Sequence, residues 1–527
     1  MSTVIGKYRN MITNIKAFPP VTYLMNKYVG VTIDSHVVNR RIKTTCEDLY
    51  YNHNVTETNA TDTKNVETSK TNKTEEVVKP NLYTVCNFTG DIIDCDNKNL
   101  TNHFEDSQWP NKSMPIMLFK NNSLVHVKAF PKVGIKKLIL QHNEITSIDD
   151  RAFKQIINLT ELDLSYNYLT GEALRPSVFE GKFSPFAYEP LEKLVTLNMA
   201  HNKLHWLNQD IFEHMSSLKI LNLSGNPLTN IDARTTIALS SLSQLEELDL
   251  SYCNLTTLPE HLFRTAIHLK KLNISGNKFF IPPASLNEAL TLEVLYMDEN
   301  PIQIINSHQS FPIMPKLKEL SLCCMPHLTV VGAGSFSGLT GLEHLRIQNC
   351  PKLESINEYA LPSENNSQPV WPPLKRLDLS DNALRYLPQR FVEKWDLLEE
   401  LDLMNNKWSC DCDNQYLIGT LLPKYGRKLM KDEVDSLVCA SPPEHEGRNL
   451  TSLSHRTLRC LDLYGARPER DATILIGVLI GLLLAIPVCL TVFVFWRRGF
   501  FFCGRQSPAT FSRAFYNRAR TDYDEFA

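Results

Sequence analysis

The sequence predicts an α/β solenoid. Its short repeats stack so that a parallel β-sheet lines the concave side, a cysteine-rich cap closes each end, and one transmembrane helix follows. Three observations support this. The pattern L-x-x-L-x-L-x-x-N-x-L recurs about twelve times between Met117 and Trp408, cysteines flank the repeats, and a run of 25 uncharged residues comes after them. A fixed-period repeat decides the architecture before any single residue does.

The register of the repeats follows from one position in each copy, the asparagine slot. These slots are Asn122, Asn143, Asn167, Asn202, Asn226, Cys253, Asn277, Asn300, Met325, Cys350, Asn382 and Asn406. Successive slots lie 21 to 35 residues apart, and most intervals fall within the ~20–29 residues typical of one class of solenoid repeat. The region therefore resembles the extracellular class of leucine-rich repeats, which implies a horseshoe with a concave parallel sheet.

Elementary physics explains the pattern. The leucines of L-x-L alternate with strand period, so they face inward, and only stacked neighbours can bury them. An asparagine amide in the slot pairs with backbone groups that the turn leaves free, and stacked amides form a ladder. Cys253 and Cys350 put a weak S–H donor in the slot, and we expect them to be buried, unpaired thiols. Met325 cannot donate, so its rung should be the weakest.

Two intervals between slots are long. The stretches Thr170–Pro190 and Asn357–Pro373 contain the additional residues. Insertions in solenoids become surface loops and often lie on a binding face. The sequence leaves open whether these two are neutral loops or part of such a face.

Four cysteines follow the last repeat in the order C-x-C-x26-C-x20-C: Cys410, Cys412, Cys439 and Cys460. They are similar to the C-terminal flanking cap of extracellular leucine-rich-repeat proteins. That resemblance implies disulfides between the first and third and between the second and fourth, Cys410–Cys439 and Cys412–Cys460. A four-cysteine zinc site is the alternative, although neighbouring zinc ligands usually have two to four residues between them.

At the other end of the repeats, Cys86 and Cys95 resemble the end of the matching N-terminal cap and are expected to be disulfide-bonded. That cap normally has four cysteines. Only Cys46 lies further upstream, so its partner stays open. The state of the adjacent Cys323 and Cys324 is also open.

Residues 472–496 form an uncharged run that is long enough to cross a bilayer as a helix. Trp496, Arg497 and Arg498 form an aromatic and basic boundary after it. The tail 497–527 has six arginines against three acidic residues, whereas the whole chain has a net charge of −3. Positive charge after the span predicts a cytoplasmic C-terminus and an extracellular N-terminal part.

Thirteen N-x-S/T sequons precede the span and none follows it, which supports this topology. They begin at Asn54, Asn59, Asn72, Asn87, Asn99, Asn111, Asn121, Asn158, Asn222, Asn254, Asn273, Asn365 and Asn449. The first twenty residues contain no apolar leader, so we expect an incorrect or alternative gene start. The predicted parts are a disordered or mis-annotated region 1–80, an N-terminal cap 81–114, repeats 115–407, a C-terminal cap 408–461, a linker 462–471, the transmembrane helix 472–496 and the tail 497–527.

The span and the tail contain three short patterns. Gly477, Gly481 and Ala485 share one helix face and predict weak homodimerisation through the membrane. Cys503, just beyond the span, is a candidate for S-palmitoylation. Tyr523 with Phe526 at +3 is similar to tyrosine-based endocytic signals, which a cytoplasmic adaptor would bind.

Catalytic patterns are missing: the sequence has no G-x-S-x-G, no H-E-x-x-H and no phosphate loop. Scattered histidines such as His142 and His201 are expected to be solvated. We therefore expect no enzyme activity, no cofactor, no metal site and no nucleic-acid partner. The two residues inside each L-x-x-L largely alternate between basic and acidic along the repeats. This alternation predicts a mutually neutralising surface; the alternative is that its central part recognises a charged protein.

The plan of repeats, cap, single span and short tail is similar to leucine-rich-repeat transmembrane adhesion proteins of the insect tartan and capricious type, and its ectodomain to Toll and slit. The resemblance implies a receptor or adhesion protein of the plasma membrane that binds a protein ligand. One alternative is an auxiliary subunit that modulates another membrane protein. The other is a Toll-like receptor without its signalling domain, because only 31 residues follow the span.

Overall fold

The computed structural model describes residues 82–105, 108–109, 113–184, 187–189, 191–365, 368–460 and 468–498. Several predictions lie outside these residues. They are the region 1–80 with Cys46 and the sequons at Asn54, Asn59 and Asn72, the sequon at Asn111, most of the linker, and the tail with Cys503, Tyr523 and Phe526.

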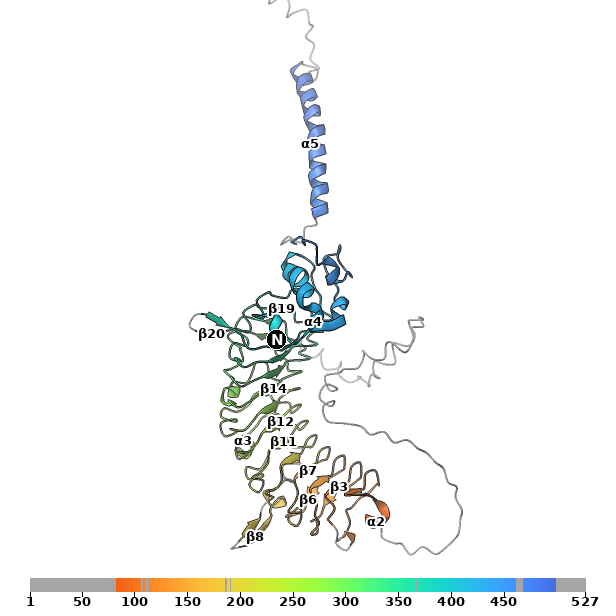
Figure 1. Cartoon of the computed structure of the whole chain (residues 1–527), viewed down its shortest axis with the longest axis vertical. Helices are drawn as coiled ribbons and strands as arrows, with labels where there is room; N and C mark the ends of the chain where they lie inside the picture. Colours follow the sequence, from red (N-terminus) through yellow and green to blue (C-terminus); the bar gives the residue numbers. More distant parts are fainter. Residues whose placement is uncertain are drawn as a thin grey trace, which may run out of the picture.

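A 14-stranded sheet lines the inner side of the arc in Figure 1. Its first two strands are antiparallel, and all other neighbours in it are parallel. In order, the strands are β1 (Asn87–Thr89), β2 (Ile92–Asp94), β3 (Ile116–Leu118), β5 (Lys137–Ile139), β7 (Glu161–Asp163), β10 (Thr196–Asn198), β11 (Ile220–Asn222), β12 (Glu247–Asp249), β13 (Lys271–Asn273), β14 (Val294–Tyr296), β16 (Glu319–Ser321), β18 (His344–Arg346), β22 (Arg376–Asp378) and β23 (Glu400–Asp402). Each of the twelve strands from β3 onward precedes one asparagine slot, so the predicted register of the solenoid is confirmed.

The outer side of the arc consists mainly of turns and very short elements. Within the repeats the structure describes a single α-helix, α3 (Ala233–Ser240), whose N-cap Asp232 accepts a hydrogen bond from the backbone N–H of Thr235. It lies in one of the longer intervals, 27 residues from Asn226 to Cys253. A shorter repeat leaves little room for a helix. The other outer elements are β4 (His126–Val127), β6 (Ser147–Ile148), β15 (Ile304–Ile305), β17 (Val330–Val331), β19 (Ser355–Ile356), η5 (Pro176–Val178), η6 (Ala284–Glu288) and η7 (Trp395–Leu397).

The core runs the length of the solenoid between the sheet and the outer turns. Leu197 on β10 lies in register with Leu162 on β7 and Leu221 on β11, and all three are buried. Each fully buried large apolar side chain contributes roughly 1.5–3 kcal/mol. Towards the outer side, the rings of Phe130, Phe153 and Phe179 stack in sequence, with centroids 6.0 and 5.7 Å apart. No repeat contains a complete core of its own.

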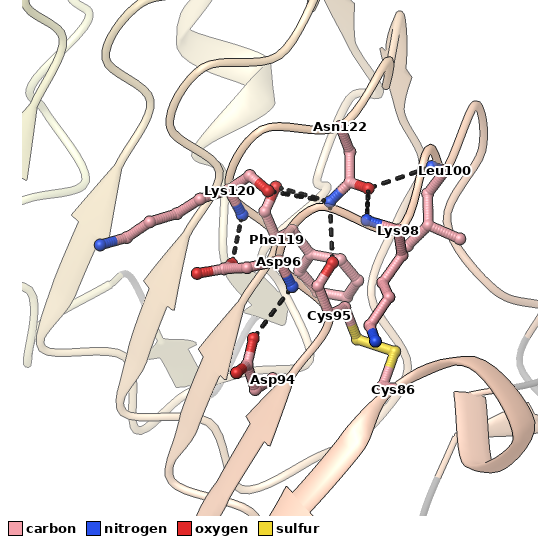
Figure 2. The surroundings of a disulfide bond; sticks show 9 residues. All are labelled: Cys86, Asp94, Cys95, Asp96, Lys98, Leu100, Phe119, Lys120 and Asn122. Atoms are coloured by element: carbon pink, nitrogen blue, oxygen red, sulfur yellow. Dashed lines mark hydrogen bonds between the residues drawn. A yellow bond between two sulfur atoms is a disulfide. The ribbon is translucent and has the colours of Figure 1, made fainter. Parts of the chain in front are cut away.

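The asparagine ladder joins successive repeats. Asn143 donates from Nδ2 to the carbonyls of Phe119 (2.8 Å) and Leu140 (3.0 Å), and its Oδ1 accepts from the N–H of Leu124 (3.2 Å). Figure 2 shows the first rung, where Asn122 donates to the carbonyl of Cys95 at 2.9 Å. The ladder thus connects the repeats to the N-terminal cap.

Three slots lack asparagine. The thiol of Cys253 donates to the carbonyl of Leu223 at 3.3 Å, and that of Cys350 to the carbonyl of Leu322 at 3.4 Å. Both thiols are free and buried, and burial raises the pKa of each to about 12. Met325 is fully buried and has no donor. That its rung is the weakest stays a prediction.

Each long interval contains a β-hairpin, so the predicted surface loops have regular backbone pairing. The first is β8 (Lys182–Ser184) with β9 (Ala187–Glu189), and the second is β20 (Ser363–Asn365) with β21 (Gln368–Val370). Both extend outward from the arc in Figure 1. Antiparallel pairing gives partners to backbone groups that have left the stack, which explains the regular structure.

Disulfides flank the repeats. Cys86–Cys95 joins α2 (Leu82–Val85) to the first strands, and Cys410–Cys439 and Cys412–Cys460 hold the C-terminal cap, in the pairs that the resemblance implied. Of the adjacent pair, Cys323 is a free buried thiol and Cys324 is disulfide-bonded. The C-terminal cap contains η8 (Cys412–Asn414), the π-helix η9 (Leu417–Gly426), α4 (Arg427–Met430), η10 (Lys431–Ser436) and η11 (Leu450–Leu453).

The last element is α5 (Pro468–Arg497), which extends away from the solenoid in Figure 1. Its segment Ala472–Arg497 is long and apolar enough to cross a membrane, judged by length and composition. Its side chains are exposed, and Gly477 and Gly481 have nothing within 4 Å of an added Cβ.

Candidate binding surface on the concave sheet

The concave face consists of three rows of side chains that cross the strands. Each strand from β5 onward buries a leucine at its centre, as β22 does with Leu377 at 1% exposure. The residues on either side point to the concave face, although the residue after the leucine is itself buried on β5, β13 and β16. We define the first row as the residues two before these leucines, the second row as the residues directly before them, and the third row as the residues directly after them. Along each row, successive side chains come from successive repeats.

The first row is an alternating series of ion pairs. Glu246 lies between Lys219 (2.8 Å) and Lys270 (2.9 Å). Hydrogen bonds from these two lysines lower the pKa of Glu246 to about 2. The pairing continues in Lys318–Glu293 and Lys375–Glu343.

The second row contains further cross-strand pairs. They are Lys137–Glu161 (2.7 Å), Lys271–Glu247 (3.8 Å) and Arg376–Glu400 (3.5 Å). His344 lies 3.9 Å from Glu319 and forms an ion pair with it only when the histidine is protonated. The two rows that the sequence marked as alternating therefore neutralise themselves across most of the face. Exposed pairs of this kind contribute little to stability, at ~0–1 kcal/mol each.

A hollow of about 230 Å³ lies near the C-terminal end of the face, over β16, β18, β22 and β23. Its charged and titratable lining consists of Glu319, His344, Arg346, Arg376, Asp378, Glu400 and Asp402. These are four carboxylates against two guanidinium groups, with one histidine. On the neighbouring strand β14, the hydroxyl of Tyr296 donates to Glu319 at 3.3 Å. The hollow is therefore polar and acidic on balance.

Third-row residues supply the three charges of the hollow that have no ion pair in the described segments: Arg346, Asp378 and Asp402. Arg346 is in register with Asp378, which is in register with Asp402. Asp378 accepts hydrogen bonds from the N–H and hydroxyl of Ser380, and Asp402 accepts one from the N–H of Met404 at 2.9 Å. Within the described part of the chain, neither Arg346 nor Asp402 has an ion-pair partner within 4 Å.

Burial and neighbouring acidic residues disfavour the charged form of the Asp402 carboxylate. Loss of solvent is the largest cause that raises its pKa, which reaches about 6, and repulsion from Asp378, Glu433 and Asp381 adds to the effect. Burial also raises the pKa of Asp378. Perturbed carboxylates without a cation are typical of functional sites, because a ligand can supply the missing charge.

In the N-terminal half of the solenoid, three aromatic side chains stack just after the strands of the concave sheet. The rings of His142, Tyr166 and His201 stack with centroids 4.1 and 4.2 Å apart. Each occupies the position before an asparagine slot, where φ lies between 51° and 54°. The two histidines are exposed, as the sequence predicted, and they also belong to this stack of rings.

Two of the predicted glycosylation sites lie in the third row of the concave sheet, and a third, Asn87, begins its edge strand β1. Asn222 is the third-row residue of β11, and Asn273 is the third-row residue of β13. Asn273 is 9% exposed and donates from Nδ2 to Asp249 at 3.1 Å, a bond that an attached glycan would remove. The strands β14, β16, β18, β22 and β23 contain no sequon. The other sequons in described segments are those at Asn87, Asn99, Asn121, Asn158, Asn254, Asn365 and Asn449.

Sequence reasoning missed the third row. It considered the residues inside L-x-x-L, which are the first and second rows, and not the residue between the second and third leucines. That position reads Asn273, Tyr296, Ser321, Arg346, Asp378 and Asp402 from β13 to β23, where a change from amide to charge would have marked the hollow. In the described segments, no group of three or more His, Cys, Asp or Glu could hold a metal ion. The arrangement offers ion pairing and hydrogen bonding to a ligand.

Comparison with known proteins agrees with this geometry. One leucine-rich-repeat family model matches residues 134–181 and 192–246, and a second matches 244–265 and 268–288. The chain contains a leucine-rich-repeat solenoid.

Several known proteins are similar to this leucine-rich-repeat chain. Mouse CD180 antigen is 28% identical over 36% of this chain and 27% of its own length. Transforming growth factor beta activator LRRC32 of Pongo abelii is 29% identical over 42% of this chain and 36% of its own length. A solved Drosophila Toll–Spatzle complex is 21% identical, covers 67% of this chain and 56% of its own, and has a TM-score of 0.45. The chain spans between 27% and 64% of the length of the curated relatives that it matches.

Proposed function

We propose that this protein is a cell-surface receptor or adhesion molecule that binds a protein ligand through the concave sheet. The observation that carries this proposal is the hollow over β16–β23, where Arg346, Asp378 and Asp402 lie together without an ion pair among the described residues, beside two rows of largely paired charges. In this proposal α5 anchors the solenoid in the plasma membrane, and the tail links it to the cell.

The proposed orientation has the solenoid outside and the C-terminus in the cytoplasm. Disulfides flank the repeats, and such bonds persist in oxidising compartments. All thirteen sequons precede α5, and arginines follow it. A leucine-rich-repeat relative, LRRC32, is named as an activator of a growth factor, which is consistent with a protein ligand here.

Two further contacts belong to the same proposal. The face of α5 that holds Gly477, Gly481 and Ala485 would associate with a second copy, since small residues let two helices approach closely. In the tail, Tyr523 and Phe526 would bind an endocytic adaptor, and Cys503 would be palmitoylated.

The second candidate function is that of an auxiliary subunit of another membrane protein. It is favoured by the same exposed face of α5, which could bind a different helix sideways. In that case the main partner would lie in the same membrane, and the concave hollow would contribute little.

Proximity labelling on intact cells separates the two candidates. The full-length chain would carry a peroxidase at its N-terminus, and labelled proteins would be identified in co-cultures of two isotopically distinct cell populations. Soluble partners or partners from the opposing population would support the receptor. Partners confined to the expressing cell's own membrane would support the auxiliary subunit. Labelling that is confined to intracellular proteins would contradict both.

A further inference from the structure

The hollow over β16–β23 has the size of one side chain. Pockets for small molecules usually span ~300–1,000 Å³, whereas this hollow measures about 230 Å³. The hollow is open on the concave face of the sheet. An extended segment of a ligand that crosses the strands can therefore insert one long side chain into it. Arg346 and Arg376 line the hollow, and Tyr296 on the next strand donates a hydrogen bond to the lining residue Glu319. Tyrosine and arginine are enriched among the residues that dominate protein interfaces.

The charges in the hollow define the sign of that side chain. Glu400 has a basic neighbour in Arg376, whereas no described cation lies within 4 Å of Asp378 or Asp402. Asp378 accepts hydrogen bonds from Ser380, and Arg346 on the adjacent strand attracts it from beyond that distance. A cation placed between Asp378 and Asp402 would form charge-assisted hydrogen bonds with both. Arg346 borders this position on the β18 side. Its positive charge would repel a second basic side chain of the ligand placed next to β18.

The strands that form the hollow contain no predicted glycosylation site, and the sequon at Asn365 lies on the hairpin β20–β21, which extends outward from the arc in Figure 1. The two sequons in the third row lie on β11 and β13, and the main-sheet strands β14, β16, β18, β22 and β23 contain none. A glycan at Asn222 would obstruct the middle of the face. The C-terminal third of the sheet is therefore one part that an extended protein segment can reach without meeting a glycan of the third row.

We propose that this hollow receives a single lysine or arginine side chain from the protein ligand, held between Asp378 and Asp402 and flanked on the Arg346 side by a neutral or acidic residue. The inference rests on the proposed function and specifies the chemistry of its ligand. Adjacent strands lie ~4.8 Å apart, so Arg346 and Asp402 are separated by roughly 10 Å. A ligand with a basic and an acidic residue at about that distance could pair with both.

The test uses fluorescent streptavidin tetramers that display a neutral Gly/Ser peptide with one central residue. That residue is arginine, its neutral analogue citrulline, or glutamate. Tetramers compensate for the weak affinity of one side chain through avidity. Binding to cells that express the full-length chain is measured by flow cytometry and divided by the surface level of each variant. This normalisation separates loss of binding from loss of folding.

We expect the arginine tetramer to bind the parent chain about fivefold better than the citrulline tetramer, a ratio that corresponds to about 1 kcal/mol. Asp402→Asn and Asp378→Asn should abolish this preference. Arg346→Gln should strengthen binding of the arginine tetramer, a gain that structural damage would not produce. The matched control is Asp163→Asn, which changes the same row on β7 and should leave the preference intact.

Three results would overturn the inference: equal binding of arginine and citrulline tetramers to the parent, no effect of Asp402→Asn, or an equal loss with Asp163→Asn. Proximity labelling with the Asp402→Asn chain distinguishes this failure from failure of the proposed function. If protein partners are still captured at the parent level, the function stands and the assignment of the hollow is wrong. If tetramers behave as expected but no extracellular or opposing-cell partner is captured, the hollow is correct and the receptor role is wrong.

Discussion

Replacement of Asp402 by asparagine should stabilise the folded chain at neutral pH. Asparagine already occupies this row at Asn222 and Asn273, where Oδ1 accepts the N–H two residues later, as Asp402 does from Met404. The substitution therefore keeps the hydrogen bond and removes only the charge. Charge repulsion from Asp378, Asp381 and Glu433 would disappear with it.

The magnitude follows from the pKa of Asp402. Burial raises it from an ordinary 3.8 to about 6. At ~1.36 kcal/mol per pH unit this corresponds to about 3 kcal/mol, which we reduce to about 1–2 kcal/mol because the carboxyl is partly exposed and screened. Below pH 3.8 the group is protonated in both the folded and the unfolded chain, so it contributes nothing. The destabilisation grows between pH 3.8 and 6 and is complete above pH 6.

Urea unfolding of the full-length chain in detergent, followed by tryptophan fluorescence, measures this effect. We expect Asp402→Asn to raise the free energy of unfolding by about 1–2 kcal/mol at pH 7.5, with the gain lost near pH 4. Asp163→Asn is the control, because Asp163 accepts a hydrogen bond from Asn198, and its replacement should not stabilise. The reasoning is refuted if Asp402→Asn is no more stable than the parent at pH 7.5, or if its gain is undiminished at pH 4.

The remaining predictions concern the cap, the membrane helix and the tail. Cys439→Ser removes a disulfide between residues 29 apart, a loss of about 2–4 kcal/mol, and should retain the chain in the secretory pathway; normal cell-surface biotinylation would contradict this. Gly481→Ile should weaken self-association in a membrane two-hybrid reporter, with Leu482→Ile as the control, and an unchanged signal would exclude this helix face. Tyr523→Ala should slow antibody uptake on live cells, and an internalisation rate equal to the parent's would remove the endocytic role.

Much of the fold can be predicted from the sequence because the same leucine and asparagine pattern recurs in twelve repeats. Leucine spacing and the asparagine slot fix the strand register, and the structure places every slot after a strand of the main sheet. Solenoid packing is local, since each repeat contacts its neighbours, so local pattern is sufficient. The hairpins β8–β9 and β20–β21 were not foreseen, because nothing in an insertion's composition reveals how its backbone pairs once it leaves the stack.

The sequence predicted the paired charges of the first and second rows but not the hollow. Alternating charges inside L-x-x-L predicted neutral rows, and Glu246 with its two lysines shows this pairing. The hollow depends on Arg346 and Asp402, which lie 56 positions apart in the sequence but only two strands apart in the sheet. Whether Arg346 and Asp402 form ion pairs depends on how their side chains lie in the folded sheet. The spacing of residues in the sequence does not determine that.

The measurement that tests the central claim most directly is site-specific photo-crosslinking on intact cells. A benzophenone amino acid would replace Arg376 at the hollow or, as a matched control, the outer-side Ile313, which is 72% exposed. We predict that the Arg376 position yields a discrete crosslinked protein from the medium or from an opposing cell and that the Ile313 position does not. Crosslinks of equal yield from both positions, or from Ile313 alone, would contradict a receptor that binds its ligand through the concave sheet.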